Sequence, residues 1–183
     1  KEVDALGGIM AIAADSSGIH FRTLNSTKGP AVRATRIQVD RSLYKTNIKK
    51  LLLREKNIQI FEASVEDLIL KNNHIKGVLT SCGKTIKASK VVLTTGTFLG
   101  GIMHTGFKKK PGGRDGDPSS TKLARKLREL PFKTGRLKTG TPPRLEGQTL
   151  NYKKFTKQPS EIPTPTLSST KTKPPPTTVD CYI

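Results

Sequence analysis

The chain has 183 residues, of which 33% are hydrophobic, and its 33 lysines and arginines against 14 acidic residues give a net charge of +19. This length is enough for one domain or a domain with an appendage, and the charge favours a polyanionic partner, although a lysine-rich proteome produces the same composition. Cys82 and Cys181 lie far apart without a Cys-x-x-Cys pair or a histidine cluster, which excludes a zinc motif and indicates a reducing compartment. No apolar run approaches membrane-spanning length.

The first third of the chain alternates helical and extended patterns. Apolar residues recur at helical spacing over residues 3–13, and the glycine pair at 7–8 predicts close packing or a kink there. Residues 19–22 predict a short strand, and residues 25–36 predict a polar turn. Apolar residues on one face predict a long helix over residues 37–52.

Strand patterns follow from residue 58. Extended segments are predicted over residues 58–70, 75–80 and 85–88, with turns at residues 72–73 and 81–84. Strands joined by such short turns form an antiparallel meander. We therefore expect a three-stranded meander in the middle of the chain.

A short apolar run with β-branched residues follows the meander at residues 91–93 and predicts a strand buried on both faces of a parallel sheet. The run ends in small residues, among them Thr95 and Gly96, which would let a ligand approach the backbone. The alternative is a core strand that ends in an ordinary loop. The order of helix, strand, meander and buried strand predicts an α/β fold, namely part of a Rossmann-like dinucleotide-binding domain with an antiparallel β-meander.

The second half of the chain is more basic and richer in turns. We predict a basic α+β insertion over residues 101–155 and an extended Pro/Thr/Lys-rich segment over residues 156–183, which leaves residues 1–100 for the dinucleotide-binding part with the meander. A helix is predicted over residues 121–130, with Asp117, Ser119 and Ser120 as candidate N-caps. Its N-terminus is either an anion site or the start of an ordinary surface helix.

Several sequence motifs together resemble one family. It is the FAD-containing subunit of the tRNA uridine 5-carboxymethylaminomethyl modification enzyme, also called glucose-inhibited division protein A. The motifs occur in the family's order: residues 1–8 (KEVDALGG), 28–36 (KGPAVRATR), 65–69 (VEDLI), 92–99 (VLTTGTFL), 112–120 (GGRDGDPSS) and 136–144 (RLKTGTPPR).

The resemblance implies an FAD-dependent enzyme that modifies C5 of the wobble uridine of tRNA together with a GTPase partner. It also implies NADH, a folate one-carbon donor, a homodimer and a bacterial cytoplasmic rather than mitochondrial location. By the same resemblance, Val65 and Ser120 match FAD contacts, while Thr95 and Gly96 stand where related flavoproteins bring a strand end to the cofactor.

Basic residues outside these cofactor positions are candidates for tRNA phosphate contacts, with a solvent-exposed surface as the alternative. Those of the helix and its surroundings lie close together beside the expected nucleotide-binding sheet. The predicted RNA-binding residues are Lys28, Arg33, Arg36, Arg125, Arg128 and Arg136.

The chain departs from the family pattern in ways that limit what it does alone. It lacks the Gly-rich fingerprint for the FAD pyrophosphate and both redox cysteines of the family, so we expect an internal fragment that is inactive by itself. Cys82 and Cys181 receive no catalytic role, and no metal site is predicted. Asp115 replaces a small residue, and residues 167–169 (LSS) replace an aromatic-flanked stretch. The alternative functions are a non-catalytic RNA-binding module and a flavin oxidoreductase acting on a small molecule.

Overall fold

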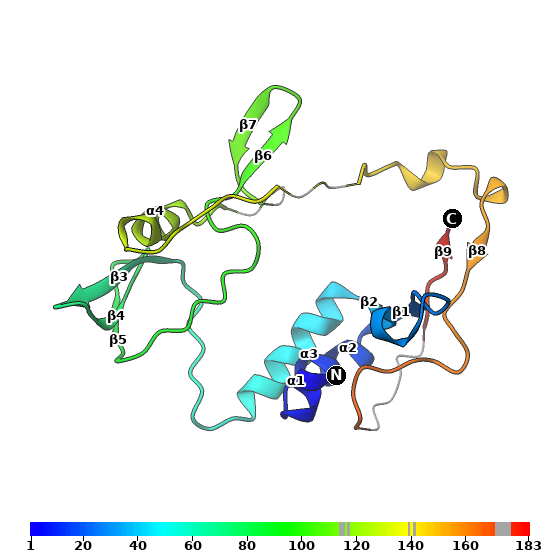
Figure 1. The fold of residues 1–183 in the computed structure, drawn as a ribbon, viewed down its shortest axis with the longest axis horizontal. Helices are drawn as coiled ribbons and strands as arrows, with labels where there is room; N and C mark the ends of the chain where they lie inside the picture. Colours follow the sequence, from blue (N-terminus) through cyan, green and yellow to red (C-terminus); the bar gives the residue numbers. More distant parts are fainter. Residues whose placement is uncertain (114–115, 117, 139, 141, 171–176) are drawn as a thin grey trace. The chain divides into compact units, whose positions relative to one another are not determined.

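The computed structural model describes residues 1–113, 116, 118–138, 140, 142–170 and 177–183, so Asp115 and the candidate cap Asp117 lie outside the described residues. The chain forms two compact units (Figure 1). The first unit comprises Lys1–Gln59 and Pro142–Ile183, and the second comprises Ile60–Thr141. In the described residues, no helix is both long and apolar enough to cross a membrane.

The first unit begins with two short helices in place of one. Helix α1 spans Glu2–Ala5 and α2 spans Met10–Asp15, and the break falls at the glycine pair, where Gly7 has φ +86°. A Cβ on Gly8 would lie 2.7 Å from the carbonyl oxygen of Val3, so a side chain at residue 8 would require the backbone to move. The predicted kink is confirmed, and its cause is close backbone packing.

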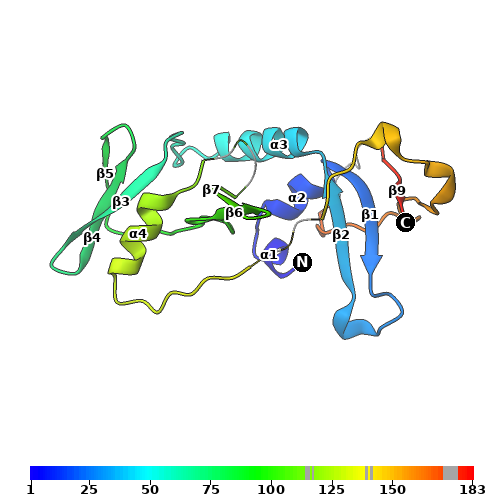
Figure 2. The same ribbon diagram turned by 90° about the horizontal axis from the view of Figure 1, so that it is seen from above.

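A two-stranded antiparallel sheet follows, formed by β1 (Gly18–Leu24) and β2 (Ala34–Val39), with η1 (Pro30–Val32) in the connection. The predicted turn over residues 25–36 is therefore too long, because its last residues pair with β1. The predicted helix start at Ile37 is also wrong, since Ile37 pairs with Phe21. Helix α3 spans Arg41–Leu53 and starts where the Asp40 carboxylate accepts a bond of 2.8 Å from the amide of Leu43 (Figure 2).

The C-terminal segment returns to the first unit and contributes to it mainly through loops. Its regular elements in the described residues are η2 (Gly147–Thr149), η3 (Tyr152–Lys154) and the paired two-residue strands β8 (Lys157–Gln158) and β9 (Cys181–Tyr182). This agrees with the expectation of little regular structure after residue 156.

The returning segment is held by backbone bonds along β1. The amide of Glu161 donates to the carbonyl of Phe21 at 3.0 Å, and the amide of Val179 donates to the carbonyl of Ile19 at 2.7 Å. Both Phe21 and the adjacent His20 are buried, and His20 Nε2 lies 3.0 Å from the carbonyl oxygen of Gln158.

Two carboxylates, one on each N-terminal helix, bind the same returning loop. Asp15 accepts bonds of 2.9 Å from the amides of both Leu167 and Ser168. Asp4 accepts a bond of 2.7 Å from the Ser168 hydroxyl and one of 2.8 Å from the amide of Ser169. Residues 167–169 are thus docked through polar contacts.

The second unit contains the predicted meander. Strands β3 (Val65–Lys71), β4 (His74–Thr80) and β5 (Thr85–Lys87) form an antiparallel sheet in the order β3-β4-β5. Asn72 and Asn73 adopt φ of 50° and 59° in the tight turn between the first two strands, a conformation that asparagine tolerates. The strand predicted from residue 58 begins only at Val65, since residues 58–64 pair with no strand in the described chain.

The buried strand predicted at residues 91–93 is wrong. These residues have no regular structure, and Val92 is 85% exposed. A buried strand needs neighbours that satisfy its backbone groups, and none of the described residues pairs with this one. All strand pairs in the described part of the chain are antiparallel.

Two further elements complete the second unit. An antiparallel hairpin of β6 (Ile102–Thr105) and β7 (Lys108–Pro111) was not predicted. The predicted helix is confirmed as α4 (Thr121–Glu129), which packs on β3 with Leu123 and Ala124 buried (Figures 1 and 2).

Candidate functional site

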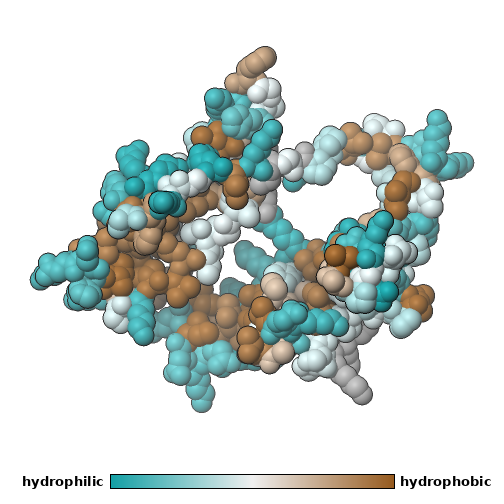
Figure 3. All heavy atoms as spheres, viewed as in Figure 1, coloured by the Kyte–Doolittle hydropathy of each residue, from teal (hydrophilic) through white to brown (hydrophobic). Residues whose placement is uncertain are grey.

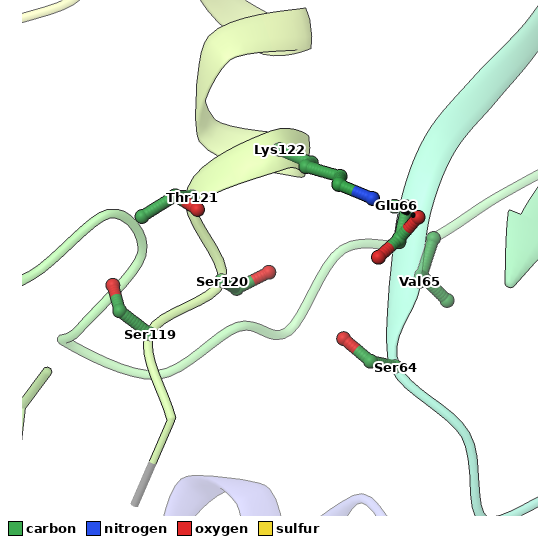
Figure 4. A pocket seen from close by; sticks show the side chains of 7 residues that line it. All are labelled: Ser64, Val65, Glu66, Ser119, Ser120, Thr121 and Lys122. Atoms are coloured by element: carbon green, nitrogen blue, oxygen red, sulfur yellow. Dashed lines mark hydrogen bonds and ion pairs between the residues drawn. The ribbon is translucent and has the colours of Figure 1, made fainter. Parts of the chain in front are cut away.

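A small polar pocket lies between the beginning of β3 and the N-terminus of α4 (Figure 4). Its volume is about 100 Å³. One side comes from the residues that open β3 and the other from the residues that open α4. The lining residues are Ser64, Val65, Glu66, Ser119, Ser120, Thr121 and Lys122.

The glycine-rich turn at residues 100–101 positions the start of α4. The amide of Gly100 donates to the carbonyl of Ser120 at 3.2 Å, and the Ser119 hydroxyl donates to the carbonyl of Gly101 at 3.2 Å. Gly100 has φ +58°, and a Cβ there would lie 2.8 Å from the Cβ of Ala124. Glycine at this position therefore permits the close approach that brings the turn against α4.

The strand side of the pocket is fixed by the meander and by one ion pair. The carbonyl of Ser64 accepts a bond of 2.8 Å from the amide of Ser81, which anchors the residue before β3. Lys122 Nζ lies 2.8 Å from Glu66 Oε2 across the pocket. Because the lysine side chain is 68% exposed, this pair contributes at most about 1 kcal/mol.

The chemistry of the pocket suits a small group that carries hydroxyls or negative charge. Ser120 is the N-cap of α4, yet its side chain makes no capping bond, so the hydroxyl is not committed to the helix. Hydroxyl groups and a helix N-terminus both favour phosphate or ribose oxygens. The pocket is small and therefore admits only a part of a dinucleotide.

The structure brings together two of the four residues predicted to contact FAD. Val65 and Ser120, which are far apart in sequence, line the same pocket. Thr95 and Gly96 do not line it, and both are exposed. Gly96 has φ +66°, and a Cβ added to it would meet no atom within 4 Å. The FAD contacts of all four residues remain predictions.

The basic residues of α4 divide into paired and unpaired ones. Lys122 pairs with Glu66, and Lys126 lies 3.7 Å from Asp67 and 3.4 Å from Glu129. The exposed Arg125 and Arg128 have no ion pair with any described residue. These two guanidinium groups are thus the more available candidates for phosphates on this helix.

Arg136 has a structural contact of its own. Both terminal nitrogens of its guanidinium donate to the carbonyl of Gly100 at 3.2 Å. Gly100 in turn bonds Ser120, so Arg136 supports the turn beside the pocket. Its predicted RNA contact remains a prediction.

The basic residues of the first unit lie in different environments. Lys28 and Arg33 are exposed, and Arg33 Nε donates to the carbonyl of Ser26 at 3.1 Å. Arg36 lies within β2 opposite Arg22, so its predicted place in a polar turn is wrong. Its Nε is buried and has no partner among the described residues. RNA binding by these three residues remains a prediction.

Sequence reasoning missed five of the seven lining residues as members of the site. Ser119 carried a signal as a candidate N-cap, and Lys122 carried one as part of the basic helix. Glu66 stood in the motif at residues 65–69, whereas Ser64 and Thr121 carried no signal, because only the packing of α4 on β3 brings them to the pocket.

The cysteines belong to other parts of the structure. Both thiols are free, Cys82 being exposed and Cys181 half-buried. The hydroxyl of Thr80 and the amide of Lys84 lower the pKa of the Cys82 thiol. No group of three or more metal-ligating side chains occurs in the residues described.

Comparison with known proteins identifies the family. The sequence profile of the family "Glucose inhibited division protein A" matches residues 1–183. The chain belongs to this family. Its fold matches the crystal structures of Aquifex aeolicus GidA in form I and in form II, each with a TM-score of 0.84 and 39% sequence identity over 99% of the chain.

The GidA match confirms the predicted fold class, an α/β region of a dinucleotide-binding domain with an antiparallel meander. It also shows the extent of the chain relative to its relatives. The match covers 31% of the Aquifex aeolicus GidA chain, so the present chain spans about a third of the length of the solved relatives.

Proposed function

We propose that the protein carrying this chain is an FAD-dependent tRNA-modifying enzyme. In this proposal it installs a carboxymethylaminomethyl or aminomethyl-type group on C5 of the wobble uridine, together with a GTPase partner. Membership of the GidA family supports the assignment to tRNA modification by a flavoprotein. The net charge of +19 supports a polyanionic substrate.

The observation that carries the proposal is the shared pocket of Val65 and Ser120. The resemblance assigned FAD contacts to both residues independently of any structure, and they line the same cavity. A cofactor that touches both residues requires them to be neighbours, and their place in one pocket meets this requirement.

The pocket residues fit one end of FAD. The hydroxyls of Ser64 and Ser120 and the N-terminus of α4 would hold ribose or phosphate oxygens, and Val65 would offer its backbone beside the adenine. When bound, FAD supplies two-electron redox chemistry. The chain's own part is to bind and orient the adenosine side and, through Arg125 and Arg128, to attract tRNA phosphates.

Further features belong to the same proposal for the intact protein. They are NADH as reductant, a folate as one-carbon donor, a homodimer and a bacterial cytoplasmic location. Residues 1–183 alone are expected to bind FAD weakly and to lack modifying activity, because one small pocket makes only part of the contacts with a dinucleotide.

The test uses the full-length protein purified from its host together with tRNA from a strain that lacks it. We expect flavin absorbance in the purified protein. After incubation with the GTPase partner, NADH and folate, we expect mass spectrometry of the tRNA nucleosides to show a new C5 substituent. Flavin without tRNA binding would indicate a small-molecule oxidoreductase instead. Binding of tRNA without flavin would indicate a non-catalytic RNA-binding module.

A further inference from the structure

The β6–β7 hairpin presents an aromatic tip above a basic stem. Phe107 lies in the turn and is fully exposed, at 104% of its reference area. All four residues of β7 are exposed, and three of them are Lys108, Lys109 and Lys110. In the space-filling view, the end of this hairpin is hydrophobic, and hydrophilic side chains lie below it together with some hydrophobic ones (Figure 3).

The lysines of the hairpin occupy both faces of the ribbon. Lys108 pairs with Thr105 and Lys110 with Met103, whereas Lys109 pairs with His104. Successive residues of a strand point to opposite faces, so Lys109 points away from its two neighbours. A ligand that contacts all three must follow the edge of the hairpin or wrap around it, as a flexible chain of phosphates does.

No carboxylate neutralises these lysines in the described part of the chain. Three acidic residues of the second unit are engaged elsewhere, because Glu66 pairs with Lys122, and both Asp67 and Glu129 pair with Lys126. Among the described residues these lysines are therefore without an ion pair, and their charge is available to an external anion.

An exposed phenylalanine at a turn adds a second type of contact. The preceding Gly106 has φ +59°, and nothing lies within 4 Å of a Cβ placed on it. The tip is thus slender, and the ring of Phe107 is free on both faces. Aromatic rings beside lysines bind single-stranded nucleic acids by stacking on bases while the cations contact the phosphates.

We propose that the β6–β7 hairpin is an RNA-contacting element, in which Phe107 stacks on an unpaired base and Lys108, Lys109 and Lys110 contact the adjacent phosphates. The proposal rests on the proposed function, which supplies tRNA as the RNA. An anionic membrane shares the attraction to lysine, but one phenylalanine offers little apolar area for insertion. A single exposed ring is enough to stack on one base, so the structure favours RNA over a membrane as the ligand.

The test measures tRNA affinity of the full-length flavin-loaded protein over a series of salt concentrations. Replacing Lys108, Lys109 and Lys110 by Gln should reduce the slope of log K against log salt by about 2, since each phosphate contact to a single strand contributes roughly 0.7. The matched control replaces Lys71, Lys76 and Lys87 by Gln, three exposed lysines of the meander. It makes the same change in charge and should leave most of the slope intact.

The aromatic contact is tested separately. Phe107→Leu keeps an apolar tip but removes the ring, and should weaken tRNA binding about tenfold at every salt concentration. Phe107→Tyr keeps the ring and should bind like the unaltered protein. Circular dichroism and flavin content, unchanged in all variants, would show that the fold is retained.

The other outcomes overturn the proposal in distinguishable ways. Equal salt slopes for the two triple variants, or unchanged tRNA binding by Phe107→Leu, would exclude the hairpin as an RNA contact. The proposed function would not be affected. Absence of tRNA binding by the unaltered protein would contradict both the hairpin proposal and the proposed function. If the hairpin variant lost binding to phosphatidylglycerol vesicles but kept tRNA affinity, the surface would belong to a membrane contact instead.

Discussion

At the scale of single residues, the turn between β4 and β5 gives Cys82 an environment that alters its thiol. Its Sγ lies 3.1 Å from the hydroxyl oxygen of Thr80, and the lowered pKa of the thiol follows first from this bond and then from the amide of Lys84. A lowered pKa increases the thiolate fraction at neutral pH, and the thiolate is the reactive form. Because Cys82 is exposed, its thiol is a useful probe of the meander.

We predict that alkylation of Cys82 by iodoacetamide has its pH midpoint below that of an ordinary thiol, and that Thr80→Val raises the midpoint. The hydroxyl removed also bonds the backbone of Lys84, so the melting temperature should fall as well. Ser81→Ala serves as the control, with the midpoint unchanged. Mass spectrometry of the labelled peptide gives the extent of alkylation at each pH. A midpoint unchanged by Thr80→Val would show that the Thr80 hydroxyl does not lower the pKa of the thiol.

Gly96 permits an equally direct test of the cofactor site. Its matched control is Gly83, since the two have φ of +66° and +77° and neither would place a Cβ within 4 Å of another atom. Replacement by alanine should therefore cost each about 1 to 2 kcal/mol of stability through backbone strain alone. If FAD approaches the backbone at residue 96, only Gly96→Ala should also lower the flavin content of the full-length protein, measured by absorbance. Equal flavin content in both variants would make Gly96 an ordinary loop residue.

Single elements were predictable where their signals are local. The meander was predicted because its turns carry asparagine and glycine at short spacing, and α4 because leucines recur on one face of a basic segment. The strand at residues 91–93 failed because burial depends on distant partners. The β6–β7 hairpin was missed because Lys108, Lys109 and Lys110 replace the apolar alternation of a typical strand.

The same limit applies to the candidate site. Val65 and Ser120 were named through resemblance, but nothing in the sequence indicates that Glu66 and Lys122 meet across the pocket. Contacts between β3 and α4 join residues more than 50 positions apart, as in the pair of Lys122 with Glu66. Such contacts follow from packing, which a local pattern does not encode.

Helix α4 carries a prediction about how its charges are used. Replacing Arg125 and Arg128 by Gln should lower the salt slope of tRNA binding by about 1.5, because neither guanidinium pairs with a described carboxylate. Replacing Lys122 and Lys126 by Gln changes the charge equally but should lower it less, because those ammonium groups already pair with acidic side chains.

Arg136 is left unaltered in these variants, since it holds the carbonyl of Gly100 and its loss should disturb the pocket. The slopes come from filter binding of tRNA at several salt concentrations. Equal salt slopes for the double arginine variant and the double lysine variant would show that α4 acts only through its net charge and that its arginines make no phosphate contacts of their own.

At the scale of the whole molecule, the first unit is assembled from both ends of the chain. Asp4 and Asp15 accept hydrogen bonds from the loop at residues 167–169. Beside β1, the carboxylate of Glu161 lies 3.6 Å from Arg22 Nε. The amide of Ser169 and the hydroxyl of Ser168 lower the pKa of Asp4. The docking of the C-terminal segment is therefore linked to pH.

The sign of this linkage gives a prediction. A depressed carboxyl pKa stabilises the docked loop above the pKa of the unfolded chain, and that contribution is lost as the pH falls through the lower folded value. We expect Asp4→Asn to speed hydrogen exchange at Ser169 near neutral pH, where the unaltered loop is protected. Glu55→Gln, at an exposed position, should leave exchange unchanged. Equal protection of Ser169 in the Asp4→Asn protein would show that the loop docks without the charge.

Because the first unit consists of two separate sequence segments, some of its contacts can form only late in synthesis on the ribosome. Thr23 of β1 bonds Glu161, a residue made 138 positions later. At about 5 to 20 residues per second, β1 waits roughly 7 to 28 s for this partner. The second unit is continuous in sequence and is completed within that interval. Strand β1 can pair early with β2, which is close to it in sequence, whereas its bonds to the C-terminal segment can form only after the second unit has been made.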